Sequence, residues 1–421
     1  MGARKGRTTR TDACRARTVA VLLGLVPLTG LGVLVPAAPA AADSGQCTMP
    51  AKTYKGRPWA LQRVLLDELW KETKGAGVKV AVIDTGVDNK HPQLKDAVDT
   101  KLGKNVLSKV PKKDADGESL PRGKENGTSD PVGHGTKVAG IIAARPDART
   151  GFVGIAPAAT IIPIRQNDGQ GGGNVGSMAQ SIDLAVKAGA DVINISQDTD
   201  EPLNADSSLE LAVERALAKE IVVVASAGND GLDGNVKTTY PASYEGVLAV
   251  ASSDRNNERA VFSQSGEFVD IAAPGVDMVS TMPGGGHCSD NGTSFSAPYV
   301  AGVAALLRAQ HDGWTAREIV AQIEQTAERS IGEHDRHVGW GIVDPVRALT
   351  EDDQPVQEPE AREGVTQAEK PTPAKLELGE TTQERNERLG TYAVVGGGVL
   401  VAVIGGGSRV HRDWRRRTVR E

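Results

Sequence analysis

Short runs of β-branched residues alternate with longer alanine-rich segments of helical period from about Val78 to Leu349. Such runs are typical of strands buried inside a parallel sheet, whose faces are covered by the connecting helices. The rhythm therefore predicts an α/β domain with a largely parallel sheet flanked by helices on both faces. At 421 residues, the chain is long enough to bury such a core without stabilisation by disulfides or bound metals.

The alternation assigns the expected elements. The predicted strands are Val78–Ile83, Thr160–Ile164, Val192–Ile195, Ile221–Ala225, Val247–Ala251 and Phe268–Ala272. The predicted helices are Thr136–Ala144, Ser177–Ala188, Ser207–Ala218, Ala297–Ala309 and Thr315–Ala327. Two polar stretches stand outside the pattern. Residues 99–130 are expected to form a surface loop, and residues 351–390, rich in Glu, Gln, Pro and Thr, are expected to form a solvated linker.

The first 42 residues have the composition of a secretory signal peptide. An apolar stretch, Val19 to Val35, is followed by small residues that end at Ala42. Before it come six basic residues, Arg4, Lys5, Arg7, Arg10, Arg15 and Arg17. This order predicts cleavage just before Asp43 and export of the remaining chain, the alternative being an uncleaved membrane helix.

A second apolar segment lies near the C-terminus, from Tyr392 to Val410. Its length is roughly that needed to cross a hydrocarbon core, so residues 391–409 are predicted to be a transmembrane helix. The arginines of residues 410–421 favour a cytoplasmic tail, which places everything before Tyr392 outside the cell membrane. A glycine-rich loop is the alternative interpretation of this segment.

The net charge and the cysteine content each exclude or allow a specific feature. The net charge of −6 and the pI near 5.8 argue against a general nucleic-acid binder, which needs a basic surface. Cys14 leaves with the signal peptide, so the exported chain keeps Cys47 and Cys288. Outside the membrane these two can form one disulfide, or they can remain unpaired.

Two motifs supply an acid and a base. Asp84 follows a predicted strand, so its carboxylate is expected at the carboxyl edge of the sheet, where α/β proteins gather functional groups. His134 lies between two glycines, which allow close backbone approach, at the start of a predicted helix. Taken alone, each residue could equally serve a turn or a helix cap.

Two further motifs supply a nucleophile and an amide. Ser294 stands in Asn-Gly-Thr-Ser-Phe-Ser-Ala-Pro, at the opening of a helix rich in small residues, where a serine is ordinarily only a cap. Asn229 follows another predicted strand, and its side-chain amide could donate a hydrogen bond to an oxyanion. A nucleophile, a base and an orienting acid from separate segments are what amide hydrolysis requires.

In this order and at these spacings, the four motifs resemble the subtilisin-like serine protease family, peptidase S8, over residues 78–349, within an expected peptidase domain of residues 75–350. The resemblance implies that Ser294 is the nucleophile, His134 the general base and Asp84 the orienting carboxylate. It also implies that Asn229, with the Ser294 backbone amide, forms the oxyanion hole, and that no cofactor is needed.

The overall layout resembles more closely the mycosins, the subtilisin-like proteases of actinobacterial type VII secretion systems. They share a signal peptide, a short extension (here residues 43–74), a protease domain, a linker and one membrane helix. The resemblance implies protein or peptide substrates and association with a secretion complex at the membrane. It leaves open whether the chain processes secreted proteins, serves as a structural subunit with dispensable proteolysis, or scavenges broadly.

The chain departs from the wider family near the expected substrate cleft. After Ser196 most relatives carry a Leu-Gly pair that edges the main specificity pocket, whereas Gln197 and Asp198 stand here. Gly171, Gly172, Gly173, Ser196 and Gln197 are the expected substrate-binding residues. Lys137 occupies a position often held by histidine. No carboxylate cluster suited to calcium is found in the sequence, so no metal site is predicted.

Overall fold

A seven-stranded parallel sheet forms the centre of the protein. The computed structural model describes residues 47–108, 122–169, 173–200, 206–233, 237–351, 354–361 and 382–418, with side chains as far as residue 415. The strand order is β2-β3-β1-β4-β5-β6-β7, and every neighbouring pair runs parallel. The strands are β1 Lys79–Asp84, β2 Lys104–Asn105, β3 Thr160–Arg165, β4 Val192–Ile195, β5 Val222–Ser226, β6 Leu248–Ser253 and β7 Ile271–Pro274.

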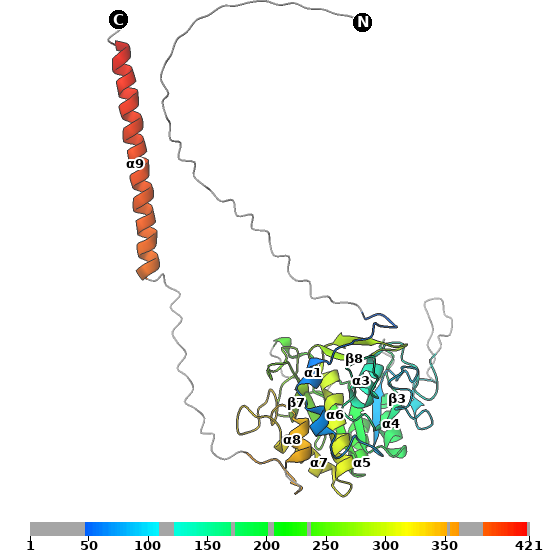
Figure 1. Ribbon diagram of the computed structural model, residues 1–421. Coiled ribbons are helices and arrows are strands. Elements are labelled where there is room, and N and C mark those ends of the chain that lie inside the picture. Colours follow the sequence, from blue (N-terminus) through cyan, green and yellow to red (C-terminus); the bar gives the residue numbers. More distant parts are fainter. Residues whose placement is uncertain are drawn as a thin grey trace, which may run out of the picture. The chain divides into compact units, whose positions relative to one another are not determined.

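Helices cover both faces of this sheet (Figure 1). The main ones are α3 His134–Ala143, α4 Val175–Lys187, α5 Ser208–Leu217, α6 Thr293–Gln310 and α7 Ala316–Gln325. Successive strand residues point to opposite faces, so Val80 and Val82 of β1 join one apolar cluster while Ala81 and Ile83 join the other. The first cluster includes α3, α6 and α7, and the second includes α4 and α5. The predicted fold class is therefore confirmed.

Several short elements escaped the sequence pattern. Strand β2 lies within the expected surface loop and pairs with β3 at the edge of the sheet, but its two residues are too few to show periodicity. Strands β8 Met278–Thr281 and β9 His287–Asp290 form a separate antiparallel hairpin. Helix α8 spans Pro345–Thr350.

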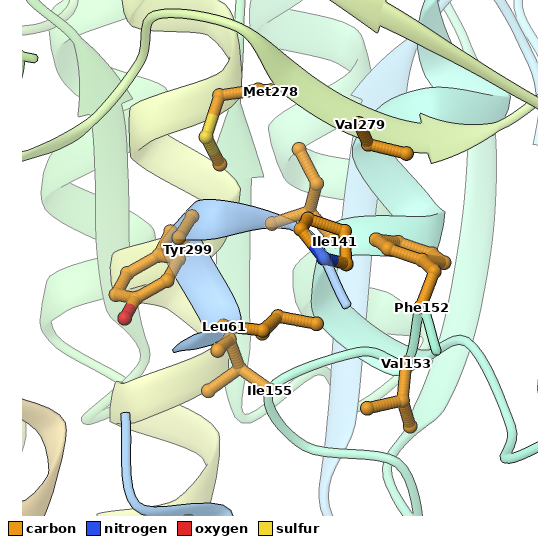
Figure 2. A pocket seen from close by; sticks show the side chains of 10 residues that line it. Leu61, Ile141, Phe152, Val153, Ile155, Met278, Val279 and Tyr299 are labelled. Atoms are coloured by element: carbon orange, nitrogen blue, oxygen red, sulfur yellow. The ribbon is translucent and has the colours of Figure 1, made fainter. Parts of the chain in front are cut away.

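The extension before the sheet is packed into the domain. Its two short helices are α1 Trp59–Gln62 and α2 Leu66–Leu69. Figure 2 shows Leu61 of α1 among Ile141, Ile155 and Tyr299, and all four side chains are buried. The apolar gap that they line measures about 10 Å³, too small for a substrate. Two tryptophans of the extension also form hydrogen bonds with the domain. Trp59 Nε1 donates to Val276 O at 2.9 Å, and Trp70 Nε1 donates to Ile155 O at 2.9 Å.

The C-terminal apolar segment is helical. Helix α9 spans Thr382–Thr418, so it begins within the residues expected to be linker. Those residues, Thr-Gln-Glu-Arg-Asn-Glu-Arg, include good helix formers, which continue the helix in the N-terminal direction. The span Thr382–Arg415 is long and apolar enough to cross a membrane, with a mean hydropathy of 1.8 in its most apolar window. The start of the linker lies against α7, where Arg317 Nε donates to Gln357 O at 2.9 Å.

Candidate active site

The site lies where the central strands of the sheet end. Asp84 is the last residue of β1, between β3 and β4. Its side chain is completely buried, and its Oδ1 accepts a hydrogen bond from Thr85 N at 2.7 Å. The carboxylate is therefore fixed in orientation at the carboxyl edge of a parallel sheet.

His134 begins α3 and is in direct contact with Asp84. Its Nδ1 lies 2.8 Å from Asp84 Oδ1 and 2.9 Å from Oδ2. Burial by itself lowers the pKa of His134, but the Asp84 charge and hydrogen bond outweigh it and hold this pKa above its ordinary value. With Nδ1–H donated to the carboxylate, the neutral ring presents Nε2 as a base.

The glycine after His134 makes this contact possible. A Cβ built on Gly135 would lie 2.1 Å from the carbonyl oxygen of Gly86 and 3.0 Å from the Cβ of Asp84. Any larger residue would push α3 away from β1. The Gly-His-Gly motif is thus explained by close packing of the helix start against the strand end.

Asp130 organises the start of α3, and the sequence reasoning missed it. Its Oδ1 accepts from Gly133 N at 2.7 Å and from Thr85 Oγ1 at 2.8 Å. Its Oδ2 accepts from Thr136 N at 2.8 Å and from Thr136 Oγ1 at 2.6 Å. One buried carboxylate thus links the residue after Asp84 to both sides of His134. Asp130 stands six residues before the predicted helix start at Thr136, which is beyond the usual capping position, so no spacing rule could have identified it.

Ser294 lies in the first turn of α6 and is tied to the end of β4. Its hydroxyl donates to Ser196 O at 3.0 Å, while Ser196 Oγ donates to Ser294 O at 2.9 Å. The Ser294 carbonyl is free of the helix ladder because Pro298, four residues later, has no N–H to donate. Pro298 therefore leaves the Ser294 carbonyl without a helical donor, and the Ser196 hydroxyl supplies a donor in its place.

Asn229 follows β5 and faces the same helix start. Its Oδ1 accepts from Thr293 N at 2.9 Å and from Thr293 Oγ1 at 3.1 Å. These bonds occupy the oxygen and leave the Nδ2 group of this exposed residue to donate outward. The side-chain amide is thus oriented beside Ser294, as an oxyanion donor requires.

The structure brings Asp84, His134, Ser294 and Asn229 into one region. The ring of Phe295, the neighbour of Ser294, lies 5.3 Å from the His134 ring between centroids. Among the described residues, the hydrogen bond that Ser294 Oγ donates goes to Ser196 and not to His134. Catalytic hydrogen bonds between a nucleophile and its base often form only with substrate bound.

A cation lies one helical turn beyond His134. Lys137 is buried, its ammonium lies 5.2 Å from the Phe295 ring centroid, and it forms an ion pair with Asp290 of β9. The pair connects the helix that carries His134 to the strand that leads into Ser294. The Lys137 charge also acts to lower the pKa of His134.

Part of the predicted substrate region can be located. Gly173 and Gln197 line an open hollow of about 490 Å³, together with Gln166, Asn174 and Met178. Ser196 contacts Ser294 and does not line this hollow. Gly171 and Gly172 lie outside the described residues.

The remaining predicted groups are the cysteines. Cys47 and Cys288 are both disulfide-bonded. In the part of the chain that the structure describes, no group of three or more His, Cys, Asp or Glu side chains is arranged to hold a metal ion.

Comparison with known proteins identifies the family. Residues 75–341 match the model of the Subtilase family, peptidase S8. The chain is a subtilase. This subtilase is 40% identical over 298 residues to the "Thermophilic serine proteinase" of Bacillus sp. (strain AK1), a match that covers 70% of this chain and 68% of that protein. It is therefore a serine protease, as its motifs predicted.

Solved structures of similar fold include proteases of type VII secretion systems. MycP1 from Mycobacterium smegmatis is 33% identical, with a TM-score of 0.62, and the match covers 75% of the subtilase and 91% of MycP1. The MycP3 protease from the type VII (ESX-3) secretion system is 32% identical, with a TM-score of 0.61, over 72% of the subtilase and 92% of MycP3. The predicted resemblance to mycosins is thus confirmed.

Proposed function

We propose that this subtilase is a membrane-anchored serine endopeptidase that acts outside the cytoplasm through an acyl-enzyme intermediate. Ser294 is the nucleophile, His134 the general base and Asp84 the carboxylate that orients the imidazole. The single observation that carries the proposal is the contact of His134 Nδ1 with both oxygens of the buried Asp84 carboxylate, at 2.8 and 2.9 Å. That contact selects the tautomer whose Nε2 can take a proton.

Acylation follows from these positions. Ser294 Oγ attacks the substrate carbonyl carbon while its proton passes to His134 Nε2. The carbonyl oxygen becomes an oxyanion, which accepts hydrogen bonds from Asn229 Nδ2 and from the Ser294 backbone N–H in the first turn of α6. The intermediate collapses when His134 returns the proton to the leaving amine, and water then repeats the sequence to release the acyl group.

The membrane assignment is supported by α9 and its flanking charge. Its apolar segment ends in arginines, which favours the cytoplasm for residues 410–421 and the outside for the catalytic domain. A signal peptide at residues 1–42, which lie outside the described residues, agrees with this topology. We also propose that Cys47 and Cys288 pair with each other, because Cys14 would be removed on export. Single cysteines introduced into residues 354–361 or 410–415, labelled with a membrane-impermeant maleimide before and after permeabilisation of the cells, test the topology.

The secretion context is proposed from the solved relatives. One of them is described as a protease from a type VII secretion system, which favours secreted proteins of such a system as substrates and its membrane complex as the partner. The second candidate function is that of a structural subunit whose proteolysis is dispensable. The variant Ser294→Ala separates the two: secretion that survives this change but is lost on deletion of the whole chain supports the structural role, and loss in both cases supports processing.

A further inference from the structure

We propose that Asp198 makes this protease select a cationic side chain, lysine or arginine, at the residue whose carbonyl is attacked. The inference rests on the proposed function and adds the substrate class. The attacked carbonyl oxygen lies between the amides of Asn229 and Ser294. In the subtilase family the segment after Ser196 edges the main specificity pocket, so the side chain of the same residue is expected to enter between that segment and the one that leads to Asn229.

The Asp198 carboxylate lies beside those segments. Ser196, two residues before Asp198, exchanges hydrogen bonds with Ser294. Gly228 immediately precedes Asn229, and a Cβ built on it would lie 3.0 Å from Asp198 Oδ2. The φ of Gly228 is also +102°, so a side chain there is disfavoured twice. The missing side chain leaves the carboxylate next to the position that the substrate residue occupies.

A second polar group borders the same space. Gln264 is completely buried, and neither its Oε1 nor its Nε2 has a hydrogen-bond partner in the part of the chain that is described. Its Cγ lies 3.2 Å from the position of a Cβ on Gly228. Gln264 thus packs beneath Gly228 and presents no exposed polar atom to a ligand. Of these two polar side chains, Asp198 is the one that an incoming ammonium or guanidinium can reach.

The surrounding charge favours a cation. Lys237 is the nearby cation, and its Nζ lies 2.7 Å from Asp200 and 3.2 Å from Asp230. Asp198 forms no ion pair with a described residue, and in this described part of the surface the carboxylates of Asp198, Asp200 and Asp230 are balanced by the single ammonium of Lys237. Asp198 is exposed to solvent. Partial desolvation of its carboxylate, reinforced by the charges of Asp230 and Asp200, raises its pKa to about 6, so the group is still ionised at neutral pH. An acidic substrate side chain would be repelled.

The test uses the full-length protein in detergent. Three coumarin peptides, succinyl-Ala-Ala-Pro-Xaa-aminomethylcoumarin, carry lysine, its uncharged analogue norleucine, or glutamate at Xaa. A fluorophosphonate titration counts active sites, so that kcat/KM is expressed per reactive Ser294. We expect a lysine-to-norleucine ratio of about 10 to 100, the size of one charge-assisted hydrogen bond, with glutamate the poorest substrate.

The variant Asp198→Asn should lower this ratio by about tenfold or more. Asp200→Asn, which removes a neighbouring carboxylate already paired with Lys237, is the matched control and should change the ratio by less than about threefold. In the wild type the ratio should fall as the pH drops through 6, because Asp198 becomes protonated. Protonation of His134 affects both substrates and cancels in the ratio.

A binding measurement on the Ser294→Ala chain tests the selectivity independently of the proposed catalytic function. If Ser294 is not labelled, the proposed function fails, and the same peptides bound to the Ser294→Ala chain still decide the selectivity. Tighter binding of the lysine peptide than of the norleucine peptide supports the role of Asp198. Equal kcat/KM or equal binding for lysine and norleucine, or an unchanged ratio in Asp198→Asn, overturns it.

Discussion

Ser196 and Ser294 exchange two hydrogen bonds, with each side-chain hydroxyl donating to the other residue's backbone carbonyl at 3.0 and 2.9 Å. A third bond supports the exchange, because Asn194 Nδ2 donates to Ser196 Oγ at 2.9 Å. The end of β4 thus holds the peptide group of the proposed nucleophile. This anchor replaces the ladder bond that Pro298 cannot make.

Removing that anchor should cost both stability and rate. In Ser196→Ala, the Ser294 carbonyl loses its donor, and the free energy of unfolding should fall by about 1–3 kcal/mol. The start of α6 is then less well positioned, and kcat should fall by about tenfold. The control is Ser181→Ala, the same exchange at a buried serine within α4, and this variant should leave kcat unchanged. Urea denaturation and active-site-titrated kinetics measure both quantities, and unchanged kcat in Ser196→Ala would contradict the anchor role.

Asp130 should be among the most sensitive positions outside the triad. Replacement by alanine leaves the start of α3 and the Thr85 hydroxyl without their acceptor, so the free energy of unfolding should fall by about 3–5 kcal/mol. Asp130→Asn keeps one acceptor oxygen and should lose about half as much. Thermal unfolding followed by circular dichroism gives the ranking. An alanine variant as stable as the wild type would rule out the capping account.

Asn229→Ala should reduce kcat while leaving substrate affinity nearly intact. Its Nδ2 group donates to the oxyanion that forms during the reaction, so the transition state loses a donor that the bound substrate does not use. The expected loss in kcat is ~10²–10³, the range known for a subtilisin that loses such a donor. A comparable rise in KM with kcat unchanged would instead make Asn229 a ground-state contact.

The pH dependence of kcat/KM should follow the charges around His134. The base must be neutral, and because the Asp84 charge and hydrogen bond outweigh burial, the acid limb should lie above pH 6.5, the ordinary pKa of histidine. The Lys137 charge lowers this pKa, so Lys137→Met should move the limb to higher pH. Lys137→Arg keeps the charge and should leave the limb in place. A limb that moves equally in both variants would show that packing against Phe295, and not charge, controls the titration.

The regular part of the fold could be predicted because burial on both faces leaves a strong sequence pattern. Strand β4 agrees with its prediction at both ends, and the other five predicted strands agree within a few residues. The two-residue β2 and the β8–β9 hairpin were missed because their residues are too few or too mixed to carry a period. Tertiary packing, such as that of Leu61 in α1, decides such short elements.

Some residues of the candidate site could likewise be predicted from the sequence, and others could not. The sequence was enough to select four candidate residues, Asp84, His134, Ser294 and Asn229, because each lies in a local motif at the boundary of a helix or strand. Asp130 and the pairing of Ser196 with Ser294 were not, because they depend on contacts between segments far apart in the chain. The juxtaposition of Asp198 with Gly228 is likewise visible only in three dimensions.

Activation of Ser294 by His134 can be measured by labelling the purified full-length chain with a fluorophosphonate probe. We expect rapid modification at Ser294, identified by peptide mapping, and its loss in a folded His134→Ala variant. Absence of labelling in folded wild-type protein, or equal labelling with and without His134, would contradict it.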